Sequence, residues 1–106
     1  MSRRKIESKK VPVRCKYYED YGMSELEAKM LIAICKGNEE YAHIIKECAE
    51  QSRHDIAEYI TKSIVYGMSY ERFEAKGNAI PMCKSDFYGY RRMTLALFKE
   101  RMRYEE

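Results

Sequence analysis

Apolar residues recur along the chain at intervals of three or four positions, which is the period of an α-helix. This interval places them on one side of a helix, where they can pack against the rest of the protein. No stretch shows the alternation of apolar and polar residues that is typical of a half-buried strand. The pattern therefore predicts an all-α fold. The clearest stretches are Leu26, Met30, Ala33 and Ile34, then Tyr41, Ile44, Ile45 and Cys48, then Ile56, Ile60 and Ile64.

Residues that start and stop helices divide this pattern into elements. Ser24 and Glu27 have the spacing of a capping box, in which the serine accepts a backbone hydrogen bond and the glutamate reaches back. Gly37 suits a helix end, and Asn38 suits the cap of the next helix. The sequence predicts about five helices, near 24–36, 39–50, 53–66, 69–76 and 84–103.

A four-residue motif occurs twice, as Tyr-Gly-Met-Ser at residues 21–24 and again at 66–69. A glycine that ends one helix, followed by a serine that caps the next, makes a tight corner. We attribute the repeat to this shared chemistry rather than to a duplication. It marks residues 66–69 as a tight helix-to-helix corner in the C-terminal half.

Length and charge divide the chain into an arm and one domain. A chain of 106 residues is one domain by size. Pro12 favours an extended segment, and residues 1–16 carry seven Lys or Arg and one Glu. We expect residues 1–16 to form a flexible basic arm and residues 17–106 a single helical domain. Residues 17–83 are acidic overall and residues 84–103 are basic. Basic segments attract phosphate groups, although a short basic arm also occurs as a solvated segment without a partner.

Several classes of protein do not fit the sequence. No apolar run approaches the roughly 20 residues that span a bilayer, and no apolar segment follows the basic start, so we expect no membrane partner and a cytoplasmic protein. The four cysteines are widely spaced in a chain with ample apolar residues, which favours reduced thiols over a disulfide scaffold. No metal-ligand cluster or phosphate loop is present, so we expect no cofactor.

The last three predicted helices should form a C-terminal trihelical unit, with the first two packed against it. Residues 56–103 thus have the layout of a helix-turn-helix, in which the last helix enters the major groove of DNA. Residues 66–74 (Tyr-Gly-Met-Ser-Tyr-Glu-Arg-Phe-Glu) resemble the fourth region of bacterial sigma factors, and residues 87–97 (Phe-Tyr-Gly-Tyr-Arg-Arg-Met-Thr-Leu-Ala-Leu) resemble its recognition helix. Small regulators of phages and conjugative elements carry similar segments. The chain departs from the family in a longer second turn and in Cys83 at the cap position. The resemblance implies a DNA-binding transcriptional regulator of a phage or mobile element, with double-stranded DNA as its partner.

This interpretation assigns roles to residues of the last predicted helix and of the arm. The first turn of the helix would face base edges, and residues one turn further would reach phosphates or guanine. Phe73, Phe87, Leu95 and Phe98 are predicted to be core. The predicted DNA-binding residues are Lys84, Ser85 and Asp86 in the first turn, Tyr88, Arg91 and Arg92 beyond it, and Arg3, Arg4 and Lys5 in the arm.

An enzyme is not expected, because catalysis needs a nucleophile, a base and an orienting group held together. His43 and His54 are the only histidines, and Asp55 points about 100° away from its neighbour His54 on a helix. The alternative function is a small helical inhibitor or adaptor of a mobile element, for example an anti-defence protein. Its acidic helices over residues 24–55 would bind a basic, nucleic-acid-binding partner. A homodimer stays open.

Overall fold

The computed structural model describes residues 12–104, and this part of the chain is helical, with no β-strand. It contains five α-helices, which confirms the predicted all-α fold. They are α1 (Glu25–Cys35), α2 (Glu39–Ser52), α3 (Ala57–Tyr66), α4 (Tyr70–Ala75) and α5 (Lys84–Tyr104). Three short 3-10 turns are η1 (Val13–Cys15), η2 (Tyr18–Tyr21) and η3 (His54–Ile56).

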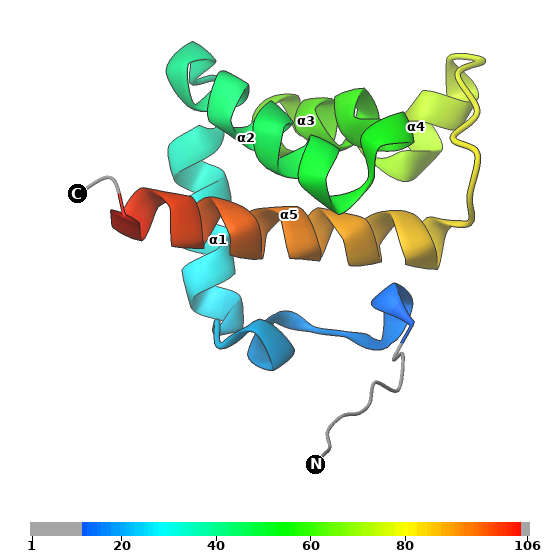
Figure 1. Cartoon of the computed structure of the whole chain (residues 1–106). Coiled ribbons are helices and arrows are strands. Elements are labelled where there is room, and N and C mark those ends of the chain that lie inside the picture. Colours follow the sequence, from blue (N-terminus) through cyan, green and yellow to red (C-terminus); the bar gives the residue numbers. More distant parts are fainter. Residues whose placement is uncertain (1–11, 105–106) are drawn as a thin grey trace.

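Helix α5 lies in the middle of the molecule. Figure 1 shows α2, α3 and α4 along one side of α5 and the N-terminal segment on the other, with α1 crossing α5 from one side to the other. Helix α2 packs along both α5 and α3. The prediction placed α2 outside a unit made of the last three helices, whereas the structure gives α2 a central position.

The predicted core residues are buried. Ile56, Ile60 and Ile64 are 0% exposed, and Phe87 is 0% exposed near the start of α5. The centre of the Phe87 ring lies 5.9 Å from that of Tyr70 and 6.4 Å from that of Phe73. Contacts between aromatic rings therefore hold α4 against α5. Phe73, Leu95 and Phe98 are buried as well.

Both copies of the repeated motif form a tight corner, of which the sequence predicted the one at residues 66–69. Gly22 and Gly67 have φ angles of 74° and 72°, in the left-handed region that favours glycine. The hydroxyl of Ser24 accepts a hydrogen bond from the backbone of Glu27 at 3.0 Å, and that of Ser69 accepts one from Arg72 at 3.2 Å. A glycine with a positive φ angle and a serine that caps the next helix therefore form each corner.

The start of the third helix differs from the prediction. The sequence predicts a helix from residue 53, but α3 begins at Ala57, after η3. Ser52, the last residue of α2, shares a hydrogen bond with Thr94 of α5 at 2.8 Å. Arg53 donates to the carboxylate of Asp55 at 2.9 Å and to the hydroxyl of Tyr90 at 3.0 Å. Contacts with α5 thus fix this corner.

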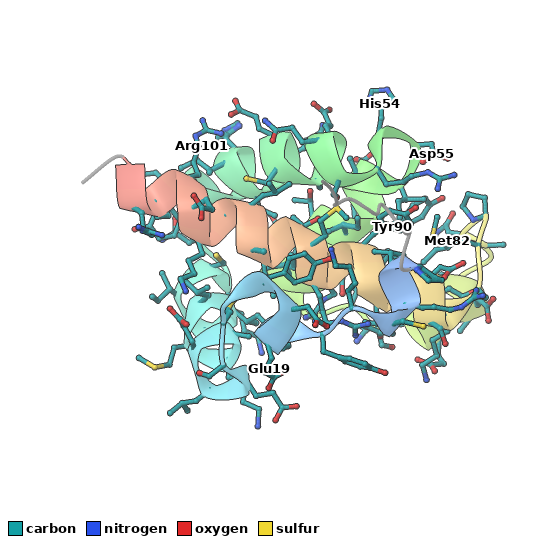
Figure 2. The ribbon with its side chains drawn as sticks, turned by 60° about the horizontal axis from the view of Figure 1, so that its bottom comes forward. Glu19, His54, Asp55, Met82, Tyr90 and Arg101 are labelled. Carbon is teal, nitrogen blue, oxygen red and sulfur yellow. The ribbon has the colours of Figure 1, made fainter. Side chains whose placement is uncertain are left out.

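The N-terminal segment is the largest difference from the prediction. Residues 12–21, here named the N-terminal strap, pack across α5, as Figure 2 shows for the segment that carries Glu19. The close approach is possible because residue 89 is glycine: a Cβ there would lie 2.6 Å from the carbonyl oxygen of Val13. The predicted flexible arm therefore includes residues 12–16, which are held on the domain. Residues 1–11 of that arm lie outside the described part.

Candidate nucleic-acid interface

A hollow of about 340 Å³ lies where the N-terminal strap meets the first turns of α5. Its side chains supply three cations, a hydroxyl and two aromatic rings. We name it the basic hollow. It is lined by Arg14, Tyr17, Lys84, Ser85, Tyr88 and Arg92.

Helical spacing explains why α5 presents four of these residues together. Positions 84, 88 and 92 are four apart, so their side chains follow one side of the helix, and Ser85 lies next to them. All four belong to the set that the sequence predicts to bind DNA. Lys84 and Ser85 are exposed, whereas Tyr88 and Arg92 are half-buried.

Arg92 connects the strap to α5 and leaves a positive charge in the hollow. Its Nε donates to the carbonyl of Lys16 at 2.8 Å, and its Nη2 donates to the carbonyl of Arg14 at 3.3 Å. The guanidinium carbon lies 4.8 Å from the centre of the Tyr17 ring. These partners are uncharged, and no acidic side chain of residues 12–104 forms an ion pair with Arg92. Within residues 12–104 the charge of Arg92 is therefore not compensated by an ion pair.

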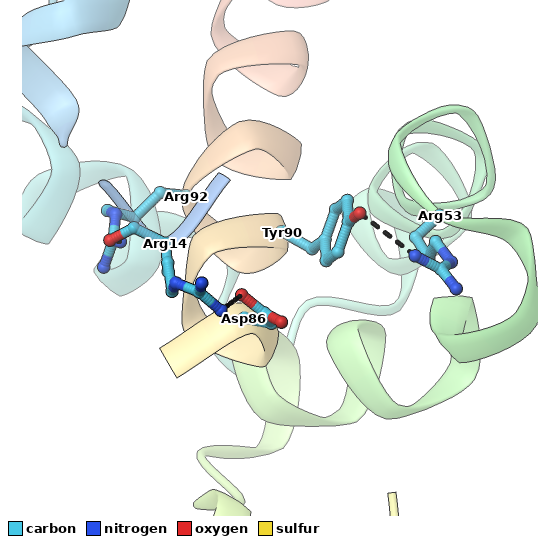
Figure 3. A network of polar contacts seen from close by, with 5 residues as sticks. All are labelled: Arg14, Arg53, Asp86, Tyr90 and Arg92. Carbon is cyan, nitrogen blue, oxygen red and sulfur yellow. Dashed lines mark hydrogen bonds and ion pairs between the residues drawn. The ribbon is translucent and has the colours of Figure 1, made fainter. Parts of the chain in front are cut away.

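The other two cations of the hollow each pair with an acidic side chain. Arg14 Nη1 lies 3.4 Å from Asp86 Oδ1, as Figure 3 shows, with both side chains partly exposed. Lys84 pairs with Glu71 of α4. The hydrogen bond from the Lys84 ammonium lowers the pKa of the Glu71 carboxyl, and the carboxylate raises the pKa of Lys84. Asp86, predicted to face base edges, thus faces the strap instead.

Arg91 does not line the hollow, although the prediction grouped it with Arg92. One residue turns a helix by about 100°, and this turn carries the Arg91 side chain into the protein. Its guanidinium carbon lies 5.8 Å from the centre of the Tyr88 ring, and its Nε is buried with no hydrogen-bond partner among the described residues. Burial lowers the pKa of the Arg91 guanidinium.

The prediction did not include two of the residues in the hollow. Arg14 and Tyr17 come from the strap, and only general signals pointed to them: the high charge of the first sixteen residues and a cluster of tyrosines. Their meeting with α5 depends on tertiary packing. Arg3, Arg4 and Lys5, the arm residues predicted to bind DNA, lie outside the described residues.

Other kinds of site have less support. Figure 2 shows His54 and Asp55 at the outer edge of the molecule, and Asp55 is already paired with Arg53. Within residues 12–104 no three His, Cys, Asp or Glu side chains are grouped to hold a metal ion. None of the helices in the same range is long and apolar enough to cross a bilayer.

The fold and the hollow together define an all-helical protein with a basic, aromatic surface at the start of its longest helix. Comparison with known protein families, curated proteins and solved structures found no match. The resemblance to the fourth region of sigma factors therefore stays a prediction.

Proposed function

We propose that this protein binds double-stranded DNA as a regulator, and that the basic hollow receives the phosphate backbone. One observation carries the proposal: the charge of Arg92, which has no ion-pair partner among residues 12–104, lines the same hollow as Lys84 and Arg14, and this hollow includes the first turn of a 21-residue helix. Phosphate binds well at such a helix end, because the free backbone N–H groups and the helix dipole both favour negative charge.

The covering of α5 by the strap limits how DNA can approach. Gly89 is buried under the strap, and only the first turn of α5 carries exposed polar side chains before Glu100. The helix would therefore meet the duplex with its tip rather than along its length. In this arrangement Lys84 and Ser85 reach the groove, and Arg14 and Arg92 contact the flanking phosphates.

The ion pairs within the hollow do not prevent such binding. Arg14 and Lys84 are paired at the surface, where an ion pair contributes about 0–1 kcal/mol. A phosphate can replace the carboxylate as the partner of each cation, at a small cost.

The test is to measure binding of a labelled random-sequence duplex at several salt concentrations by fluorescence anisotropy. Affinity should fall as salt rises, and Lys84→Ala or Arg14→Ala should reduce the slope by about 0.9 for each phosphate that the variant no longer neutralises. Lys46→Ala, which removes an exposed charge on α2 away from the hollow, is the matched control and should leave the slope unchanged. A protein that binds no duplex at low salt would overturn the proposal and favour the protein-binding alternative.

Asp86 distinguishes the observed geometry from the predicted one. Since Asp86 holds Arg14 in an ion pair, Asp86→Asn should free that cation and raise affinity for every duplex. If Asp86 instead contacted base edges, the same substitution would lower affinity for a preferred site. Weaker binding by this variant would contradict the role of Asp86 as a competitor for Arg14.

A further inference from the structure

Tyr17 presents an aromatic ring to solvent at the edge of the basic hollow. It is 57% exposed, although it lines the hollow together with the cations of α5 and of the strap. The guanidinium carbon of Arg92 lies over one face of the ring, 4.8 Å from its centre. Because Arg92 covers this face, the exposed area belongs to the other face and to the ring edge. One flat aromatic surface is therefore open to a ligand.

The ring is held in place by the protein itself. The backbone N–H of Tyr17 donates to the carboxylate of Asp20 at 2.8 Å, and its carbonyl accepts from the backbone N–H of Asp20 at 3.0 Å. On the covered face, Arg92 is fixed by its hydrogen bonds to the carbonyl groups of Lys16 and Arg14. A ligand that stacks on Tyr17 therefore loses little affinity to the ordering of its site.

The charges around the ring indicate which flat ligand fits. Arg92 has no ion-pair partner among residues 12–104, and Arg14 lies beside it, as Figure 3 shows. Lys84 completes the three cations of the hollow. An aromatic face next to several cations suits a nucleotide, whose base stacks on the ring while its phosphate meets the cations. The volume of about 340 Å³ also falls within the range of about 300–1,000 Å³ that is usual for small-ligand sites.

A second exposed tyrosine lacks these surroundings. Tyr66, at the end of α3, is 53% exposed and does not line the hollow. Its hydroxyl donates to the carboxylate of Glu39 at 3.0 Å, and this negative charge opposes the approach of a phosphate. Exposure alone therefore does not define the site. The neighbouring cations distinguish Tyr17 from Tyr66, which makes Tyr66 a matched control.

We propose that the open face of Tyr17 stacks on an unpaired base of a single-stranded nucleic acid, while the cations of the basic hollow hold its phosphates. The phosphate contact rests on the proposed function, and the base contact goes beyond it. In an intact duplex the neighbouring bases cover each base face, so Tyr17 can stack only on a base outside the duplex stack. Tyr17 should therefore add to the affinity for a single strand and not to the affinity for a duplex.

The first test compares variants by fluorescence anisotropy at one salt concentration. The probes are a labelled oligonucleotide of about 10 nucleotides, made as DNA and as RNA, and the DNA strand annealed to its complement. Tyr17→Leu keeps an apolar side chain over Arg92 but cannot stack. It should bind the single strands at least about fivefold more weakly than the parent and the duplex equally well. Tyr17→Phe, which keeps a ring, and Tyr66→Leu should both stay close to the parent.

The second test detects the stacking directly. The chain contains no tryptophan, so Tyr17→Trp introduces a single fluorescent reporter at the site. A base stacked on the indole quenches its fluorescence. Unlabelled single strand should therefore quench this variant, and the duplex should leave its fluorescence nearly unchanged. Tyr66→Trp is the control and should not be quenched by either.

The outcomes separate this inference from the proposed function. Salt-dependent duplex binding, with equal binding of single strands by Tyr17→Leu and the parent and no quenching, would overturn the base contact and leave the proposed function intact. The same loss of affinity for single strand and duplex would show that Tyr17 only supports the strap, and would also overturn the base contact. Single-strand binding that depends on Tyr17, in a protein that binds no duplex, would overturn the proposed function alone. Binding of neither would overturn both.

Discussion

Gly89 is the residue on which the position of the N-terminal strap depends. Glycine inside a helix is about 1 kcal/mol less favourable than alanine, yet this one lies in the second turn of α5. A Cβ at this position would lie 2.6 Å from the carbonyl oxygen of Val13 and 3.0 Å from the backbone nitrogen of Arg14. Both atoms belong to the backbone, so no side-chain rotation relieves the contact. The strap lies where it does because residue 89 has no side chain.

The substitution Gly89→Ala should therefore release the strap, although it improves the intrinsic helix propensity of α5. We expect trypsin to cleave after Arg14 and Lys16 much faster in this variant, because both sites leave the surface of α5. Far-ultraviolet circular dichroism should show that the helices remain. Ser85→Ala, an exposed change on the same helix, is the control. Equal cleavage rates in Gly89→Ala and the parent would contradict this account of the strap.

The sequence identifies residues of the candidate site better than it predicts which residues surround them in space. A glycine inside a helical pattern indicates a close backbone approach, but it does not say which segment approaches. Arg91 and Arg92 are the same type of residue and lie about 100° apart around the helix. The side of α5 that packs on the protein decides which of the two faces outward, and the sequence does not fix that side. The sequence therefore grouped both as DNA contacts. Four of the six predicted residues of α5 do line the basic hollow: Lys84, Ser85, Tyr88 and Arg92.

At the scale of the elements, α4 depends most on its cap. It has six residues, too few for a helix to be stable alone, and the hydroxyl of Ser69 accepts a hydrogen bond from the Arg72 backbone at 3.2 Å. Ser69→Ala should lower the free energy of unfolding by about 1 kcal/mol, measured by urea denaturation. Ser69→Asp, which keeps an acceptor, should stay close to the parent. Equal destabilisation of the two variants would show that the cap is not the cause.

Helix positions follow from local chemistry, but the orientation of α1 does not. Caps at Ser24, Asn38 and Ser69 act within four residues, and all three accept the expected backbone hydrogen bond. Helix α1 has apolar residues on two sides, and the sequence predicts that the side of Leu26 and Met30 packs on the protein, whereas in the structure the opposite side does. Small side chains decide between them: Ala28 and Cys35 allow close packing of backbones, and the larger Leu26 and Met30 remain outside.

At the scale of the whole molecule, the buried thiols couple stability to pH. Burial raises the pKa of the Cys35 thiol from 9.0 to about 11. Between these values the unfolded chain loses this proton and the folded chain keeps it, so the free energy of unfolding falls as pH rises from about 9 to about 11. Thermal denaturation should show a decline over this range that is shallower in Cys35→Ala. Cys15→Ala, which removes an exposed thiol, should decline like the parent. Identical slopes in the two variants would contradict the assignment to Cys35.

The central position of α5 has a consequence for how the protein is made. A ribosome adds about 5–20 residues per second, so α1 to α4 are synthesised before the helix on which they pack. Until then the isoleucines of α3 and the ring of Phe73 have no α5 to cover them, and the strap has no Gly89 to pack against. The growing chain therefore presents apolar surface to chaperones throughout its synthesis. It can complete its fold only after residues 84–104 have left the exit tunnel.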